Sequence, residues 1–238
     1  MKADTLRASA NGEMEVQSFR MRILGTMIGI CFHALLVTAL ASAQASSQET
    51  DLDKRVKKFL DEHRNDWHDL NVPASDGKLL HDIVLKNKYT RALEIGTSTG
   101  HSTIWIAWAL SKTGGKLITI EIDKGRYEQA LKNFKEAGLD GYIDARLADA
   151  HELVPKLAGP FDFVFSDADK DWYKNYFVAV SPKLVVKGCF TAHNVSRGRR
   201  GFGGIREYIE YVESLPHYST TIDSRGAGMS ISYKTAPD

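Results

Sequence analysis

The stretch FDFVFSDADKDWY, residues 161–173, joins a short apolar run to a dense group of charged side chains. Asp167, Asp169, Lys170 and Asp171 all lie within five residues directly after that run. Such a cluster fits either a solvated turn or an active site at the end of a buried strand. Parallel α/β sheets bind ligands outside the carboxyl ends of their strands, so the second interpretation places these side chains at a ligand site.

A second polar group, His193 and Asn194, ends the next predicted strand. Adjacent parallel strands would bring Asp167 near both residues. A carboxylate, an imidazole and an amide oxygen form a plausible divalent metal site with open positions for substrate. Lys170 lies one turn further on and could reach a hydroxyl bound to that metal. The competing interpretation is that His193 is a structural histidine, or one that only supports a ligand.

The first predicted strand ends in a glycine turn that runs from Glu94 through Gly96 and Gly100 to Ser102. Glycines at such a turn let a ligand approach the backbone, and the next helix offers free N–H groups. The spacing is not that of dinucleotide enzymes, and a P-loop lysine is missing. Glu94 would fit better beside a cation than beside a pyrophosphate. A tight structural turn is the alternative.

Acidic residues also end the second and third predicted strands. Glu121 follows the first glycine by about 25 residues, where an acid can accept both hydroxyls of a ribose. This favours a nucleoside ligand, either NAD or a sulfonium nucleoside, over an exposed acid at a helix start. Asp149, which precedes Ala150, could bind an adenine amino group or cap the following helix.

Alternating helix and strand patterns from Asp51 onward must position these residues. Apolar periodicity predicts helices over 51–66, 75–88, 100–113, 124–139, 150–159, 171–180 and 204–215, and strands over 91–97, 115–123, 142–149, 161–167, 187–195, 218–224 and 228–235. Ser75 is the expected N-cap of the second helix. Five βα units followed by a hairpin predict an α/β fold: a doubly wound, mostly parallel seven-stranded sheet with a C-terminal antiparallel hairpin.

Composition narrows the class of protein. The chain has 238 residues and a net charge of +1, so it lacks the basic excess typical of nucleic-acid binding. Its two cysteines cannot form a disulfide framework, and no Cys/His cluster suggests structural zinc.

The first 43 residues differ in kind from the rest. Arg20 and Arg22 precede an apolar segment, 23–43, that ends in Ala41-Ser42-Ala43. This pattern predicts an N-terminal extension with a signal peptide, then a single domain over 44–238 that is exported to the periplasm or secreted. An uncleaved membrane anchor and a cytoplasmic protein are the alternatives.

These strand ends, in this order, resemble the cation-dependent O-methyltransferases, the group that includes catechol and caffeoyl-CoA O-methyltransferases. The resemblance runs from about Asn71 to Lys234. LEIGTSTGHST is similar to the family's S-adenosylmethionine (SAM) loop, LITIEID to its ribose-binding strand, and DADKDWY to DADKDNY of the plant enzymes. It implies a Rossmann-like class I methyltransferase with Lys170 as general base. It further implies that Asp167 ligates the metal and that the cofactor contacts are Val72, Glu94, Gly96, Ser102, Glu121, Asp149, Ala150 and Asp167.

One position departs from that pattern. The family usually ends its fifth strand with Asp-Asn, where this chain has His193-Asn194. If His193 is a ligand, the metal preference would move from magnesium towards manganese, iron or zinc. If it is not, metal would bind weakly or not at all, and His193 could assist as a base.

The expected acceptor is a catechol-like or other vicinal-diol phenol. A glycine-rich loop after the fifth predicted strand contains Arg197, Arg199 and Arg200. It fits either a substrate lid, whose arginines would suit an anionic substrate, or a plain solvated loop. Two other functions compete: an NAD-dependent oxidoreductase and a non-catalytic SAM-fold binding protein. The helices before Asn71 resemble the family's dimerisation region, which implies a possible homodimer.

Overall fold

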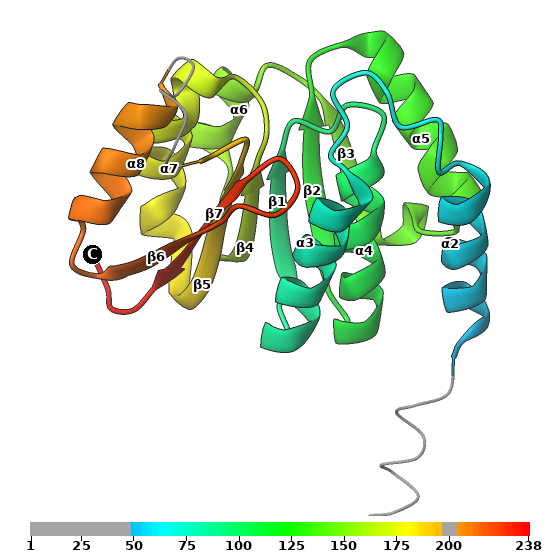
Figure 1. Cartoon of the computed structure of the whole chain (residues 1–238), viewed down its shortest axis with the longest axis horizontal. Coiled ribbons are helices and arrows are strands. Elements are labelled where there is room, and N and C mark those ends of the chain that lie inside the picture. Colours follow the sequence, from blue (N-terminus) through cyan, green and yellow to red (C-terminus); the bar gives the residue numbers. More distant parts are fainter. Residues whose placement is uncertain (1–48, 197–203) are drawn as a thin grey trace, which may run out of the picture. The chain divides into compact units, whose positions relative to one another are not determined.

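The computed structural model describes residues 49–196 and 204–238 (Figure 1). The chain divides into two compact units, Met1–Thr50 and Asp51–Asp238, and of the first only residues 49 and 50 are described. The predicted signal peptide and its cleavage site therefore lie outside the described residues and stay predictions. Within the described ranges, no helix is long and apolar enough to span a membrane.

A single seven-stranded sheet, ordered β3-β2-β1-β4-β5-β7-β6, forms the centre of the second unit. Strands β1 to β5 pair in parallel, whereas β7 pairs antiparallel with both β5 and β6. The strands are β1 (Arg91–Ile95), β2 (Lys116–Glu121), β3 (Ile143–Leu147), β4 (Phe161–Ser166), β5 (Leu184–His193), β6 (Tyr218–Asp223) and β7 (Met229–Lys234). The predicted fold is confirmed. The strand order reverses between β1 and β4, where doubly wound sheets bind their ligands.

Helices cover both faces of this sheet (Figure 1). They are α2 (Asp51–Glu62), α3 (Ala74–Asn87), α4 (His101–Thr113), α5 (Lys124–Ala137), α6 (Ala150–Lys156), α7 (Tyr173–Val180) and α8 (Ile205–Ser214), with short 3-10 turns at Asp140–Tyr142, Lys170–Trp172 and Ser181–Lys183. Leu93 and Val164 pack with α6, α7 and α8, while Ala92 and Phe163 pack with α3 and α4. Neighbouring strand residues thus alternate between two cores, as the period of a β-strand requires.

The start of α3 differs from the prediction. Ser75 does not cap this helix, because Pro73 occupies the N-cap position and Ser75 already lies inside the first turn. The Ser75 hydroxyl instead donates to Asp76 Oδ1 at 3.1 Å. Proline suits this position because its fixed φ is compatible with helix entry and no N–H is lost there.

Candidate functional site

The carboxyl ends of β1 and β4 are packed tightly together. The backbone N–H of Asp167 donates to Ile95 O at 2.8 Å, which continues the pairing of the two strands. Gly96 has a φ of +99°, and a Cβ there would lie 2.8 Å from Asp167 O. Glycine is therefore required for the first loop to cross the end of β4.

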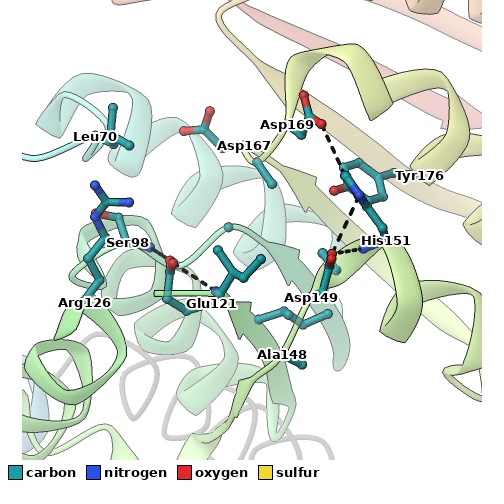
Figure 2. Close-up of a pocket in the computed structure, with 15 residues that line it drawn as sticks. Leu70, Ser98, Glu121, Arg126, Ala148, Asp149, His151, Asp167, Asp169 and Tyr176 are labelled. Carbon is teal, nitrogen blue, oxygen red and sulfur yellow. Dashed lines mark hydrogen bonds and ion pairs between the residues drawn. The ribbon is translucent and has the colours of Figure 1, made fainter. Parts of the chain in front are cut away.

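A pocket of about 370 Å³ opens at these strand ends (Figure 2). Its walls come from the loops after β1, β2, β3 and β4, and they include the predicted residues Gly96, Glu121, Asp149, Ala150 and Asp167. Leu70 and Arg126 also line the pocket. The structure thus brings five predicted site residues from four separate strands into one cavity.

Glu121 is held rigidly at this pocket. Its Oε2 accepts from Ser98 N at 2.7 Å, and its Oε1 accepts from the N–H groups of Ile122 at 3.0 Å and Asp123 at 2.9 Å. The residue is buried, so it is not an exposed acid at a helix start. Carboxylate oxygens have further lone pairs, so Glu121 can still accept a ribose hydroxyl.

Asp149 caps a helix and borders the pocket, while its contact with an adenine stays a prediction. Its Oδ1 accepts from His151 N at 2.8 Å and caps α6, and the residue also lines the pocket. His151 stacks on Trp172 with ring centroids 3.8 Å apart, and its Nε2 lies 3.3 Å from Asp169 Oδ2. Figure 2 shows His151 between the two carboxylates. Nothing in the sequence marked His151, since the contact needs α6 and the end of β4 to meet.

An ion pair crosses the opposite wall of the pocket. Arg126 donates twice to the carboxylate of Asp69, at 2.9 Å each, and Ser98 Oγ donates to Asp69 O at 2.6 Å. Asp69 and Leu70 both have positive φ values, 41° and 64°, which non-glycine residues rarely adopt. These contacts hold the segment before α3 against the pocket, and no motif in the sequence indicates them.

Val72 and Ser102 lie close to the pocket but do not line it. Val72 is buried, its carbonyl accepts from His101 Nδ1 at 2.8 Å, and it borders a separate cavity of about 700 Å³ between α2, α3 and α4. Ser102 is buried at the start of α4. Their predicted cofactor contacts stay predictions.

Glu94 is fully buried and incompletely paired. Thr119 Oγ1 donates to its Oε2 at 2.6 Å, and Thr103 Oγ1 donates to the same oxygen. Glu94 Oε1 and the hydroxyl of Ser166 have no hydrogen-bond partner among the described residues. Burial raises the pKa of Glu94 to about 7, against the lowering effect of neighbouring hydroxyls.

These orphaned groups provide a test of the predicted SAM. A buried carboxylate oxygen and hydroxyl without partners are costly unless a ligand or water satisfies them. SAM carries a positively charged amino group, whose hydrogen bonds the carboxylate of Glu94 would accept. It also carries a ribose, whose hydroxyls would donate to Glu121. The residues therefore fit this cofactor.

At the end of β4, Asp167 and Lys170 join a hydrogen-bonded network. Lys170 Nζ donates to Asp167 Oδ1 and, at 2.8 Å, to the hydroxyl of Tyr173. That hydroxyl in turn lies 3.1 Å from His193 O, to which it donates. Burial raises the pKa of Tyr173 well above its ordinary value, with a further contribution from Asp167, so this phenol stays protonated.

His193 is held between two carboxylates. Its Nδ1 lies 3.0 Å from Asp167 Oδ2, and its Nε2 lies 2.8 Å from Asp76 Oδ2. Burial by itself would lower the pKa of His193, but its hydrogen bonds to Asp167 and Asp76 outweigh this and raise it. Asp76 is not marked by any pattern in the sequence, and it is only 2% exposed although it lies in the first turn of α3.

The side chains around His193 do not fit the predicted metal. Both ring nitrogens face carboxylates, so the imidazole offers no free lone pair, and Asp167 is already paired with the side chains of Lys170 and His193. Asn194 is exposed. Across residues 49–196 and 204–238, no group of three or more His, Cys, Asp or Glu could hold a metal ion. Arg197, Arg199 and Arg200 lie outside these ranges.

Comparison with known proteins decides the family. Residues 43–196, more than half of the chain, match the O-methyltransferase family. This chain belongs to the O-methyltransferase family. A putative caffeoyl-CoA O-methyltransferase from Arabidopsis thaliana is 30% identical over 169 residues, 70% of this chain and 72% of that protein. A catechol O-methyltransferase from Niastella koreensis is 41% identical over 112 residues, 45% of this chain and only 50% of that protein.

Solved O-methyltransferases have the same fold. TomG from Streptomyces achromogenes, solved in complex with SAM, aligns with a TM-score of 0.66 at 27% identity and covers 83% of this chain and 96% of its own. A Bacillus cereus O-methyltransferase solved with SAH aligns with a TM-score of 0.67 at 25% identity, covering 83% and 97%. The predicted family and enzyme class are therefore confirmed.

Proposed function

We propose that this O-methyltransferase transfers the methyl group of SAM to a hydroxyl of a catechol-like phenol. The observation that carries the proposal is the position of Lys170, which binds Asp167 at the edge of the nucleoside pocket. The catechol and caffeoyl-CoA O-methyltransferases among its relatives support a phenolic acceptor. The SAM and SAH in two similar structures support the cofactor.

The chain's own residues would bind the cofactor in three places. Glu121 would accept from the ribose hydroxyls, Asp149 and Ala150 would border the adenine, and the unpaired oxygen of Glu94 would accept from the amino group. When bound, SAM supplies a methyl group on a positively charged sulfur that an oxygen nucleophile can displace.

Lys170 would prepare that nucleophile. A phenol ionises near pH 10, so its proton must be removed before the oxygen can attack efficiently. The neutral amine of Lys170 would accept this proton, and Tyr173 and Asp167 fix the position of Nζ. The residues around His193 do not fit the predicted divalent metal, so the proton transfer would depend on Lys170 and the side chains that hold it.

The direct test is to incubate the full chain with SAM and a panel of catechols, monophenols and aromatic acids. A product heavier by one methyl group on a catechol oxygen supports the proposal. SAM binding without methylation of any acceptor would instead favour a non-catalytic binding protein. Faster turnover of carboxylated catechols than of neutral ones would support the anionic substrate that the three arginines suggest.

Export and dimerisation are also proposals. Export rests on the residues 20–43 alone, and mass spectrometry of the protein from its native host would find Gln44 at the N-terminus if cleavage occurs there. Light scattering of the purified chain would give twice the monomer mass if the predicted homodimer forms.

A further inference from the structure

The clamp on His193, made of Asp76 and Asp167, is built from parts of the chain that are far apart. Asp76 comes from α3, His193 ends β5, and Asp167 follows β4. The three side chains are 3%, 4% and 10% exposed. Water therefore contributes little to balancing their charges, and the groups must balance one another.

The hydrogen bonds of the clamp determine what His193 can offer. A neutral imidazole has one N–H and one lone pair, whereas both nitrogens here face carboxylate oxygens that can only accept. Both nitrogens of His193 are therefore donors, and the ring is a cation rather than a ligand. Lys170 Nζ donates to the remaining oxygen of Asp167.

The C-terminal hairpin closes the clamp from the other side. The backbone N–H of Ala227 donates to Asp76 Oδ2 at 3.0 Å. Gly226 has a φ of +63°, and a Cβ there would collide with the Asp76 carboxylate. The turn between β6 and β7 can approach Asp76 this closely only with glycine at position 226.

We propose that His193, clamped by Asp76 and Asp167, takes the place of a divalent cation beside the acceptor site, so that methyl transfer needs no metal. Asp76 is a positioning residue, which acts by orienting His193. The claim that methyl transfer needs no metal rests on the proposed function. The claim that the site binds no divalent metal depends only on the clamp. Electrostatic stabilisation of a developing phenolate needs a fixed positive charge nearby, which the clamped ring provides and to which Lys170 adds once it has accepted the phenol's proton.

Metal binding tests the proposal without any acceptor. Purified protein, stripped with chelator and shown to bind SAM by calorimetry, is titrated with Mn²⁺ and with Mg²⁺. We expect no saturable binding up to about 1 mM, which is weak on the scale of protein sites. Saturable binding at micromolar Mn²⁺ that is lost in Asp167→Asn would overturn the proposal.

A substitution at the centre of the clamp sharpens this result. His193→Asp would place three carboxylates together, which is the oxygen-rich donor set that Mn²⁺ and Mg²⁺ prefer. We expect this variant to bind Mn²⁺ at least tenfold more tightly than the wild type. His193→Asn, which adds an amide of the same size without a third carboxylate, is the matched control. Equal Mn²⁺ affinity in the wild type and His193→Asp would contradict the proposal.

Activity then separates this inference from the proposed function. We expect chelation to change the kcat/KM of the wild type less than twofold, and Asp76→Asn to lower kcat while the SAM affinity is unchanged. A loss of tenfold or more on chelation, regained with one metal, overturns the inference but leaves the methylation itself. Failure to methylate any acceptor overturns only the proposed function, since the metal titration is decided without substrate.

Discussion

The two halves of the site are built in different ways. The nucleoside half, at the ends of β1, β2 and β3, holds its carboxylates with neighbouring backbone N–H groups, as Glu121 and Asp149 show. The acceptor half, at the ends of β4 and β5, holds Asp167 and His193 through charged side chains. One of these, Asp76, is 117 positions away from His193 in the sequence. The nucleoside half thus depends on contacts that are local in the sequence, whereas the acceptor half depends on side chains that only the tertiary fold brings together.

Removing Lys170 should have the largest effect. In Lys170→Met, we expect kcat to fall by about 10²–10⁴-fold, because this is the usual contribution of a positioned base. SAM affinity, a property of the other half, should stay unchanged. Steady-state kinetics and calorimetry measure the two. Lys174→Met is the control, since Lys174 lies one turn further on and pairs with Glu207. Unchanged turnover in Lys170→Met would remove Lys170 from the mechanism.

Breaking the clamp should lower stability strongly. We expect Asp76→Asn to reduce the free energy of unfolding by about 3 kcal/mol, because it leaves a buried charge without one partner. Asp82→Asn, on the same helix, removes an exposed partner of Lys78 and should cost at most about 1 kcal/mol. Urea denaturation measures both variants. Similar losses for the two would show that the acceptor half does not depend on the clamp.

The cofactor half should respond to pH through Glu94. Its pKa of about 7 means that the carboxyl is mostly protonated at pH 6 and mostly ionised by pH 7.5. If its carboxylate accepts from the amino group of SAM, the affinity should rise roughly five- to tenfold over this interval. Calorimetry at several pH values measures this. Glu94→Gln should abolish the dependence, and a slope that survives in this variant would assign it to another group.

The smallest effect should come from the ion pair that crosses the pocket wall. In Arg126→Gln, we expect SAM to bind about two- to fivefold more weakly, since partly exposed ion pairs contribute at most about 1 kcal/mol. Arg146→Gln breaks a similar pair with Asp144 on β3, outside the pocket, and should leave the affinity unchanged. Stopped-flow binding at low and high salt would show whether the lost pair alters association or release. Identical affinities for the two variants would contradict a role for Asp69 and Arg126.

The difference between the halves also explains what the sequence could predict. Strand ends are local features, so periodicity and acidic residues at the right spacing pointed to Gly96, Glu121, Asp149 and Asp167, and the mostly parallel sheet with its C-terminal hairpin followed from the alternation of elements. The Asp76–His193 contact needs α3 to pack beside the end of β5, and no spacing along the chain encodes that. The sequence predicted His193 as a metal ligand for the same reason, since no pattern along the chain indicates that Asp76 binds its ring.

The prediction for Ser75 failed on a smaller scale. A serine before an apolar run usually caps a helix, but here the N-cap is Pro73, two residues earlier, so Ser75 lies in the first turn. Its hydroxyl donates to Asp76, so Ser75 contacts the clamp instead of capping the helix.

The most direct test of the account is the initial rate of methyl transfer from SAM to a catechol in metal-free buffer, compared with the rate after Mn²⁺ or Mg²⁺ is added. If the clamped His193 replaces the metal, the catechol is methylated at the same initial rate, within twofold, in metal-free buffer, with Mn²⁺ and with Mg²⁺. Turnover that appears only when a divalent metal is added would contradict it.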